Sequence, residues 1–347
     1  MPETALLDLS LCELRRFVAA GGESAFRADQ IWHAVYRDLV SSYAEIATLP
    51  QALRDRLAGA LPFNFLLAIG RRESQDNRTR KILFRLADGE TVEAVLMFYE
   101  RRRAVCLSTQ VGCPLCCAFC ATGRGGFARD LTPGEIVAQA LFFARELAQT
   151  GERLTHLVYM GMGEPFLNYE ATMKSIRILN DPDGFALGAR HFTVSTAGIL
   201  PGIGRLAEEG LQVNLAVSLH AANDRLRDAL VPINRQYPLA ELVKACQAYT
   251  ERTHRRVTFE VALIDGMNDS SKQAHEMADL LAGLLCHVNL IPLNPVLGCS
   301  FRRSSRERVG AFADVLRKRG IPVTVRLGRG IEIQAGCGQL RERSFYS

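Results

Sequence analysis

Four cysteines within eight residues are the part of this sequence whose spacing most directly indicates chemistry. Cys113, Cys117 and Cys120 follow the pattern C-x3-C-x2-C, which lets three thiolates converge on one inorganic centre from a single loop. Iron-sulfur clusters normally take four cysteine ligands. Three ligands leave one iron of a four-iron cluster open, so the pattern predicts a 4Fe-4S cluster that can bind and reduce a substrate.

The same loop allows two other interpretations. Cys113-x2-Cys116 or Cys117-x2-Cys120 has the spacing of half a zinc site, although a zinc site built from four cysteines usually draws on two separated pairs. Cys116 also creates a second possible ligand set, with Cys113 and Cys120. The residues alone leave the choice between Cys116 and Cys117 open.

The elements that must position this loop are strands alternating with helix-length segments. The predicted strands are residues 104–108, 155–160, 192–195, 213–218, 257–264, 288–291 and 323–325. Such alternation predicts a parallel α/β barrel. Catalytic groups in parallel barrels gather where strands end and βα loops begin. Polar motifs follow five of these strands: the cysteine loop, Gly161-Met162-Gly163-Glu164-Pro165, Ser195-Thr196-Ala197-Gly198, Ser218-Leu219-His220 and Asn294-Pro295.

We divide the chain into three segments. Residues 1–62 predict a small helical domain, with helices over 11–17, 26–36 and 52–58. Residues 63–98 predict a β-hairpin extension, in which 81–86 and 91–97 pair across a turn at 88–89. Residues 99–347 predict the barrel, where Thr132-Pro133-Gly134-Glu135 begins a helix that runs to about Ala148. Glu93 lies in a predicted strand among apolar neighbours, an unusual place for a carboxylate unless that face is functional.

Composition indicates a large core and an anionic partner. The 347 residues are 48% hydrophobic and carry a net charge of +5. Residues 301–347 hold 11 Lys and Arg against 4 Asp and Glu, or +7, which leaves −2 for the rest. This basic end suggests nucleic acid, although a solvated helix face would explain Arg317-Lys318-Arg319 alone. We expect no membrane span, since no apolar run approaches roughly 20 residues. Residues 1–4 begin no targeting segment, so we expect a reducing cytoplasm and no structural disulfide.

Together the motifs resemble the RlmN/Cfr family of radical S-adenosylmethionine (SAM) RNA methyltransferases over nearly the whole chain. The matching segments are Phe26-Arg27-Ala28-x-Gln30-Ile31-Trp32, Val92-Glu93-x-Val95, Cys106-x3-Gln110-Val111-Gly112-Cys113, the cysteine loop, Met160-Gly161-Met162-Gly163-Glu164-Pro165, Ser218-Leu219-His220, Val231-Pro232-Ile233-Asn234 and Ala335-Gly336-Cys337-Gly338-Gln339-Leu340. Two positions depart from the family pattern: Cys116 is extra, and Gly336 stands where Ala is more usual.

The resemblance implies a fold and a role for each matching position. The fold is a partial (β/α)6 barrel of the radical SAM type. The cluster ligands are Cys113, Cys117 and Cys120, and the open iron chelates SAM. The SAM site is lined by Gly163, Glu164, Ser195, Ser218, Leu219, His220 and Asn294. Cys337 is the methyl-carrying cysteine, Cys106 is its redox partner and Glu93 is a catalytic base.

The implied reaction is methylation of adenine C2 in 23S rRNA, at the peptidyl transferase centre, and in tRNA anticodon loops. That ring carbon is electrophilic, so it cannot attack the SAM methyl directly. Two SAM molecules are consumed instead: one methylates Cys337, and the other yields the radical that activates this methyl. The resemblance also implies an external electron donor, of flavodoxin type or similar, and we expect a monomer. The alternatives are adenine-C8 methylation of 23S rRNA, as in antibiotic resistance, and a non-catalytic zinc-stabilised RNA-binding protein.

Overall fold

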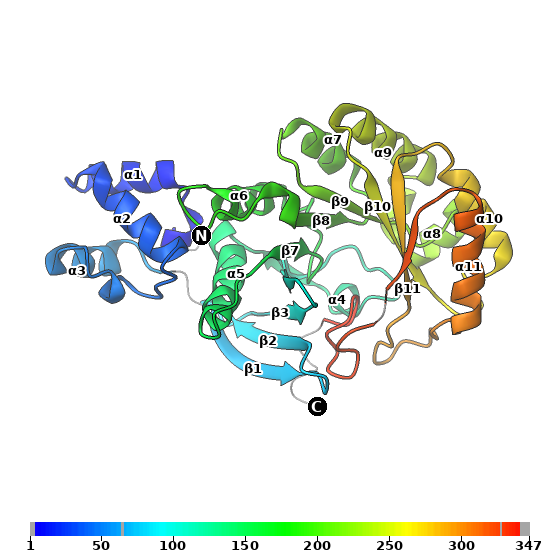
Figure 1. Cartoon of the computed structure of the whole chain (residues 1–347), viewed down its shortest axis with the longest axis horizontal. Helices are drawn as coiled ribbons and strands as arrows, with labels where there is room; N and C mark the ends of the chain where they lie inside the picture. Colours follow the sequence, from blue (N-terminus) through cyan, green and yellow to red (C-terminus); the bar gives the residue numbers. More distant parts are fainter. Residues whose placement is uncertain (1–3, 64–65, 327, 341–347) are drawn as a thin grey trace.

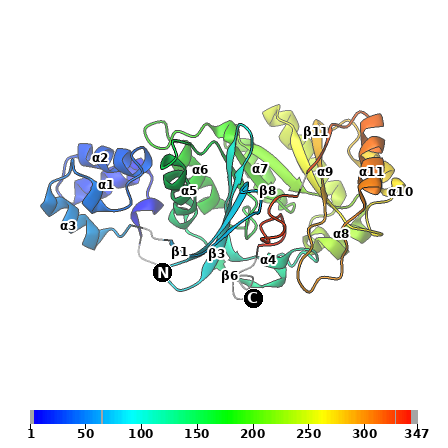
Figure 2. The same ribbon diagram turned by 60° about the horizontal axis from the view of Figure 1, so that its bottom comes forward.

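Three helices form a separate group at the N-terminal end of the chain, beside α5 and α6 (Figures 1 and 2). The computed structural model describes residues 4–63, 66–326 and 328–340. The three helices are α1 (Leu11–Ala20), α2 (Ala25–Tyr36) and α3 (Gln51–Ala60), and they confirm the predicted helical segments. A capping box starts α1, since Ser10 Oγ accepts from the Glu13 amide at 3.3 Å and the Glu13 carboxylate accepts from the Ser10 amide at 2.7 Å.

One ten-stranded sheet organises the rest of the chain. Its order is β1-β2-β3-β4-β7-β8-β9-β10-β11-β12. The strands are β1 (Leu67–Glu73), β2 (Thr79–Arg85), β3 (Thr91–Phe98), β4 (Arg103–Cys106), β7 (His156–Tyr159), β8 (Phe192–Thr196), β9 (Asn214–Ser218), β10 (Val257–Leu263), β11 (Cys286–Pro292) and β12 (Val323–Val325). From β4 to β12 every neighbouring pair is parallel, so the predicted strand-helix alternation is confirmed. Their carboxyl ends therefore meet on one rim.

The segment before the barrel contains the predicted hairpin and one more strand. β2 and β3 pair antiparallel across the predicted turn, with Arg85 opposite Thr91. β1 was not predicted as a strand; it adds to the outer edge of β2. β3 then pairs antiparallel with β4, placing Val95 opposite Cys106. The three strands thus extend the barrel sheet past its first parallel strand.

Helices cover the outer face of the parallel strands and leave the inner face for the site (Figure 1). They are α5 (Pro133–Ala148), α6 (Tyr169–Asn180), α7 (Leu200–Glu208), α8 (Asp224–Leu230), α9 (Leu239–Thr253), α10 (Ser271–Leu280) and α11 (Arg306–Lys318). The short α4 (Ala121–Arg124) instead follows the cysteine loop on the inner side. Short 3-10 turns lie at Leu6–Asp8, Tyr43–Glu45, Ala189–His191 and Pro232–Arg235. Within the described part of the chain, none of the helices combines the length and apolar character needed to cross a membrane.

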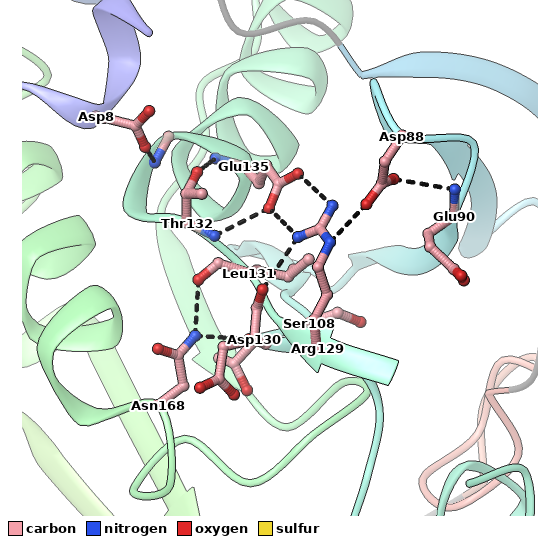
Figure 3. Close-up of polar contacts among 12 residues, drawn as sticks. Asp8, Asp88, Glu90, Ser108, Arg129, Asp130, Leu131, Thr132, Glu135 and Asn168 are labelled. Atoms are coloured by element: carbon pink, nitrogen blue, oxygen red, sulfur yellow. Dashed lines mark hydrogen bonds and ion pairs between the residues drawn. The ribbon is translucent and has the colours of Figure 1, made fainter. Parts of the chain in front are cut away.

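The start of α5 joins three parts of the molecule (Figure 3). Thr132 and Glu135 form the predicted capping box, with the Thr132 amide 2.9 Å from the Glu135 carboxylate. Asp8, from the N-terminal segment, accepts from the Gly134 amide at 2.8 Å. Arg129 binds both Glu135 (2.8 Å) and Asp88 (2.6 Å), which lies in the hairpin turn. An acidic group at a helix N-terminus is stabilising, so this end of α5 fixes the helical domain and the hairpin to the barrel.

Candidate active site

A small two-stranded sheet closes the base of the cysteine loop. It pairs β5 (Gln110–Gly112) with β6 (Phe127–Asp130), and the sequence did not predict it. The Cys113 amide donates to the Gly126 carbonyl at 2.8 Å. Gly112 has φ +77°, and a Cβ there would lie 2.0 Å from the Gly126 oxygen, so only glycine permits this approach.

Three of the loop cysteines line one cavity, and Cys116 does not. Cys113, Cys117 and Cys120 face the cavity together with residues from the rim of the barrel. Cys116 has a left-handed backbone (φ +52°), and its exposed side chain lies 3.5 Å from the Pro114 carbonyl. Cys116 therefore does not share the cavity with the other three cysteines.

The three cavity cysteines fit a multi-iron cluster. Burial, followed by the nearby thiols, raises the pKa of Cys113 to about 12 and the pKa of Cys117 well above its usual value. Both thiolates therefore need a cation to stabilise them, which cluster iron supplies. Among the residues that the structure describes, no three His, Cys, Asp or Glu side chains are close enough to hold a single metal ion. A cubane cluster does not require that closeness, because each cysteine binds a different iron.

Glu164 brings a buried carboxylate to the same cavity. Its two oxygens accept from the amides of Ala197 (2.7 Å) and Phe166 (3.1 Å). Burial nevertheless raises its pKa to about 7. A cationic ligand would therefore stabilise the ionised form of this carboxylate. The preceding Gly163 has φ +103° and packs against Gln110, whose side-chain oxygen accepts from the Glu164 amide at 2.8 Å.

His220 has a defined tautomer at the next strand end. Its Nδ1 accepts from the Ala262 amide at 3.0 Å, so the ring proton lies on Nε2. Burial, with a smaller effect from Arg227, lowers its pKa to about 3, and the ring is therefore neutral at ordinary pH. Its edge packs on Phe119, with ring centroids 4.6 Å apart. His220 thus contributes an uncharged polar side chain to the cavity wall.

Six of the seven predicted SAM-site residues line this cavity: Gly163, Glu164, Ser195, Ser218, His220 and Asn294. Leu219 does not. It is fully buried behind the rim, where its amide donates to the Glu260 carbonyl at 3.0 Å. Asn294 carries an open acceptor, because its buried Oδ1 has no hydrogen-bond partner within the described residues. A buried unpaired acceptor fits a polar ligand that supplies a donor.

Cys337 lies at the boundary between two cavities. It lines the one that contains the three loop cysteines, and it also lines a second one that contains Cys106. The side chain of Cys337 is exposed because it faces both cavities. Cys106 is buried at the end of β4, and burial raises its pKa to about 12. The structure therefore brings together the two lone cysteines, which are far apart in the sequence.

The segment that carries Cys337 is tied to the cysteine loop and to the end of β11. Figure 2 shows it, in red, between β3 and α4. The Ala121 amide donates to the Gly338 carbonyl at 2.7 Å, and Thr122 Oγ1 donates to the Leu340 carbonyl at 2.6 Å. On the other side, Asn294 Nδ2 donates to the Cys337 carbonyl at 3.1 Å. These bonds fix the backbone of Cys337 while leaving its sulfur free to react.

Glu93 is not part of either cavity. Its carboxylate is fully buried and pairs with Lys81, whose Nζ lies 3.0 Å from Glu93 Oε1. Lys81 Nζ also donates to the Gln334 carbonyl at 3.2 Å, three residues before Cys337. In this conformation Glu93 is linked to the Cys337 segment through Lys81 rather than through direct contact with the cavities.

Two arginines near the cysteines, one half-buried and one fully buried, were missed from the sequence. Arg326 lines both cavities and pairs with Glu260 at 3.5 Å. Burial raises the pKa of Cys337, and Arg326 opposes that rise. Arg227 is fully buried below the rim, where it donates to the Ala197 carbonyl (2.6 Å) and to Asn234 Oδ1 (2.7 Å). The sequence offered one indication close to Arg227, which was the family motif that contains its partner Asn234.

Comparisons with known proteins cover the whole chain. A model of the radical SAM superfamily matches residues 107–280, and a model of the ribosomal RNA large subunit methyltransferase N-terminal domain matches residues 4–61. Proteins named probable dual-specificity RNA methyltransferase RlmN are 48% identical in Chloroflexus aurantiacus, covering 99% of this chain and 94% of the relative, and 46% identical in Geobacillus kaustophilus, covering 99% and 93%. A crystal structure of a radical SAM methyltransferase from Sphaerobacter thermophilus is 54% identical, with a TM-score of 0.96 over 98% of this chain and 99% of that one.

Proposed function

Since this chain belongs to the RlmN family of radical SAM RNA methyltransferases, we propose that it methylates C2 of an adenine in both 23S rRNA and tRNA. Membership implies a 4Fe-4S cluster and SAM as cofactors. The dual specificity in the names of the relatives supports two RNA substrates. The targets in this proposal are the peptidyl transferase centre and the anticodon loop.

The observation that carries the proposal is the position of Cys337 between the two cavities. One cavity holds Cys113, Cys117 and Cys120 together with the strand-end residues assigned to SAM, and the other holds Cys106. A methyl carrier must be reached by SAM on one side and by an adenine and a second thiol on the other. That Cys337 lines both cavities supports this role.

In this proposal the cluster, when bound by Cys113, Cys117 and Cys120, supplies the electron that cleaves SAM to a 5′-deoxyadenosyl radical. Cys337 first accepts a methyl group from another SAM molecule, and Arg326 favours the thiolate that this transfer needs. Cys337 then loses a hydrogen atom from this methyl group to the 5′-deoxyadenosyl radical and bonds to the adenine ring through the remaining methylene. The unpaired electron that this leaves on the ring passes to a one-electron carrier when the ring proton is removed, so a closed-shell thioether between Cys337 and the aromatic ring remains. Two SAM molecules are consumed in each turnover.

Cys106 releases the product. Its thiolate attacks the Cys337 sulfur, an S–S bond forms, and the bond between sulfur and methylene breaks. The electron pair of that bond goes to the methylene carbon, which takes up a proton and becomes the methyl group of the product. The pKa of Cys106, raised to about 12, means that its proton must leave as the attack proceeds. Arg326 opposes that rise in the pKa of Cys106 too. External reductant restores the two thiols.

Glu93 is proposed as the base that removes the ring proton, and its burial sets a condition on that role. Lys81 must release either the Gln334 carbonyl or the Glu93 carboxylate before the base can reach an adenine bonded to Cys337. Movement of the Cys337 segment would therefore also expose the base. A flavodoxin-type electron donor and a monomeric state complete the proposal.

Nucleoside analysis after anaerobic reaction tests this function. Cluster-loaded protein, SAM with a labelled methyl group, reductant and bacterial RNA should yield labelled 2-methyladenosine in both the 23S rRNA and the tRNA fractions. Labelled 8-methyladenosine would move the assignment to the C8 enzymes. An absence of methylated adenosine, from protein that still cleaves SAM, would contradict the proposal.

A further inference from the structure

Four arginines surround Phe98 and Tyr99, the two aromatic residues where β3 ends. Arg80 and Arg103 lie over the Phe98 ring, with Cζ 5.7 and 5.3 Å from its centroid. Both are neutralised by carboxylates: Arg80 by Glu73 (2.7 Å) and Glu146 (3.1 Å), and Arg103 by Glu152 (2.6 Å). The charges of Arg80 and Arg103 are therefore balanced by carboxylates within the fold.

Among the described residues, the other two arginines, Arg102 and Arg329, have no such carboxylate partner. Arg329 and Arg102 lie over the Tyr99 ring, at 4.5 and 5.7 Å from its centroid. Within residues 4–63, 66–326 and 328–340, neither guanidinium has a carboxylate within 4.0 Å. Asp76 is near enough to feel the Arg329 charge, but its carboxylate binds Ser74 Oγ (2.6 Å) and the Arg78 amide (3.0 Å). Among the described residues, these two cations share one aromatic ring with no acid beside them, which makes the ring a candidate site for an anion.

The Tyr99 ring and one backbone bond hold these cations in place. A guanidinium over an aromatic face is attracted by the ring electrons, and Arg329 Nη1 also donates to the Phe98 carbonyl at 3.2 Å. Tyr99 itself is fixed on the β3 side, where its hydroxyl lies 3.6 Å from Met97 Sδ. Arg102 is exposed. The Arg329 guanidinium is therefore oriented before any ligand arrives, whereas Arg102 keeps the freedom of an exposed side chain.

Tyr99 and Arg329 stand beside the reacting sulfurs. Both line the cavity that contains Cys106 and Cys337. The rest of that wall is largely apolar, from Met97, Val158, Ile291 and Leu340. An adenine placed against Cys337 would extend its own sugar-phosphate chain out of this apolar cavity, past Tyr99 and the two arginines.

We propose that Tyr99, Arg102 and Arg329 form a phosphate clamp, in which the two guanidinium groups bind the RNA backbone next to the adenine that enters the Cys106–Cys337 cavity. The clamp rests on the proposed function, because it takes the target to be an adenine in RNA. Arg329 holds the nearer phosphodiester and Arg102 the one further out. Phosphate contacts position a nucleic acid without reading its sequence, which suits an enzyme with two RNA substrates.

Chemical double-mutant cycles test the clamp. Binding of an anticodon stem-loop RNA is measured by fluorescence anisotropy across a salt series, for the wild type and for Arg102→Ala/Arg329→Ala. The RNA is also made with one neutral methylphosphonate at each linkage within two nucleotides of the target adenine. We expect the double variant to bind about tenfold more weakly or worse, with a salt slope lower by about 1.4, or about 0.7 for each lost phosphate contact on a single strand. Two neighbouring linkages should each, when neutral, remove about half of the difference between the two proteins, and an RNA that is neutral at both should remove most of it.

Three further variants keep the test decisive. Lys244→Ala/Arg252→Ala removes two exposed cations from α9, on the far side of the molecule from β1–β3 (Figure 1), and should change binding less than twofold. Tyr99→Phe keeps the ring and should bind like the wild type, whereas Tyr99→Leu should weaken binding. Melting temperatures of all variants report on folding.

The clamp is overturned if the loss of binding caused by the double variant and the loss caused by a neutral linkage simply add at every linkage. It is also overturned if the salt slope does not change. The clamp and the proposed function can fail separately. If the wild type binds RNA but leaves adenine C2 unmethylated, the proposed function is wrong. The binding measurements with the variants and the neutral linkages still test the clamp in that case.

Discussion

Lys81 and Glu93 form an ion pair in which both side chains are fully buried, with Lys81 Nζ 3.0 Å from Glu93 Oε1. They are diagonal neighbours on β2 and β3, since Glu93 lies directly opposite Leu83 and Lys81 opposite Val95. The same Nζ donates to the Gln334 carbonyl. The pair therefore connects the hairpin to the segment that carries Cys337.

Removing one partner of this pair should destabilise the fold strongly. Lys81→Met removes the cation that lies 3.0 Å from the buried Glu93 carboxylate, and breaking a buried ion pair costs about 3–5 kcal/mol. Urea unfolding should show this loss in the free energy of unfolding. The double variant Lys81→Met/Glu93→Leu should be closer to the wild type, because the carboxylate is removed together with its cation. Equal losses in the single and double variants would show that the pair contributes through packing instead.

The choice between Cys116 and Cys117 is testable by iron content. Cys117→Ala should lose bound iron and SAM cleavage, because its sulfur faces the cavity beside Cys113 and Cys120. Cys116→Ala should retain both, since its exposed side chain does not line the cavity. Iron analysis, visible absorbance and 5′-deoxyadenosine formation measure the outcome. The reverse pattern would mean that Cys116 is the ligand.

The two lone cysteines should fail at different steps. Cys106→Ala should load the methyl, form the bond to adenine and then stall, which leaves a protein-RNA crosslink that survives denaturation and contains the Cys337 peptide. Cys337→Ala should form neither product nor crosslink, and the double variant should match it. Denaturing gels with nuclease digestion and peptide mass spectrometry detect the adduct. Normal turnover by Cys106→Ala would refute release through a disulfide.

Glu164 should make the protein less stable as pH rises. Its pKa is raised to about 7 in the folded protein from an ordinary value of 4.5, so the folded state binds the proton more tightly. Stability is therefore lost as pH increases from about 4.5 to about 7, by about 3 kcal/mol for this group. His220, with its lowered pKa, acts in the opposite direction over an overlapping range.

The difference between the wild type and Glu164→Gln isolates the carboxylate from His220. Unfolding free energies of the two proteins, measured without SAM, should diverge with pH between about 4.5 and 7, and the variant should lack the fall due to Glu164. A constant difference across this range would show that the carboxylate does not titrate there. Saturating SAM should reduce the divergence if its cationic groups pair with Glu164.

The sequence predicted most strands, because apolar and β-branched residues mark them and helix-length segments separate them. It missed β5 and β6, which span three and four residues and flank the cysteine loop, where no helix-length segment sets them apart. It could not choose between Cys116 and Cys117, since that choice depends on one left-handed backbone angle. Glu93 was recognised as an unusual strand carboxylate, but its partner Lys81 is set by cross-strand register. Arg326 was missed because a single basic residue after a short strand carries no pattern.

The bonds from Ala121 and Thr122 to the Cys337 segment have a consequence for how the enzyme matures. They join the loop that receives the cluster to the last described stretch of the chain, so ordering one end of this contact favours ordering the other. Any ligand that binds the folded cysteine loop in preference to the unfolded one also stabilises the C-terminal segment. Iron insertion and the docking of the methyl carrier are thus thermodynamically linked, and a protease that cuts near residue 337 should distinguish cluster-loaded from iron-free protein.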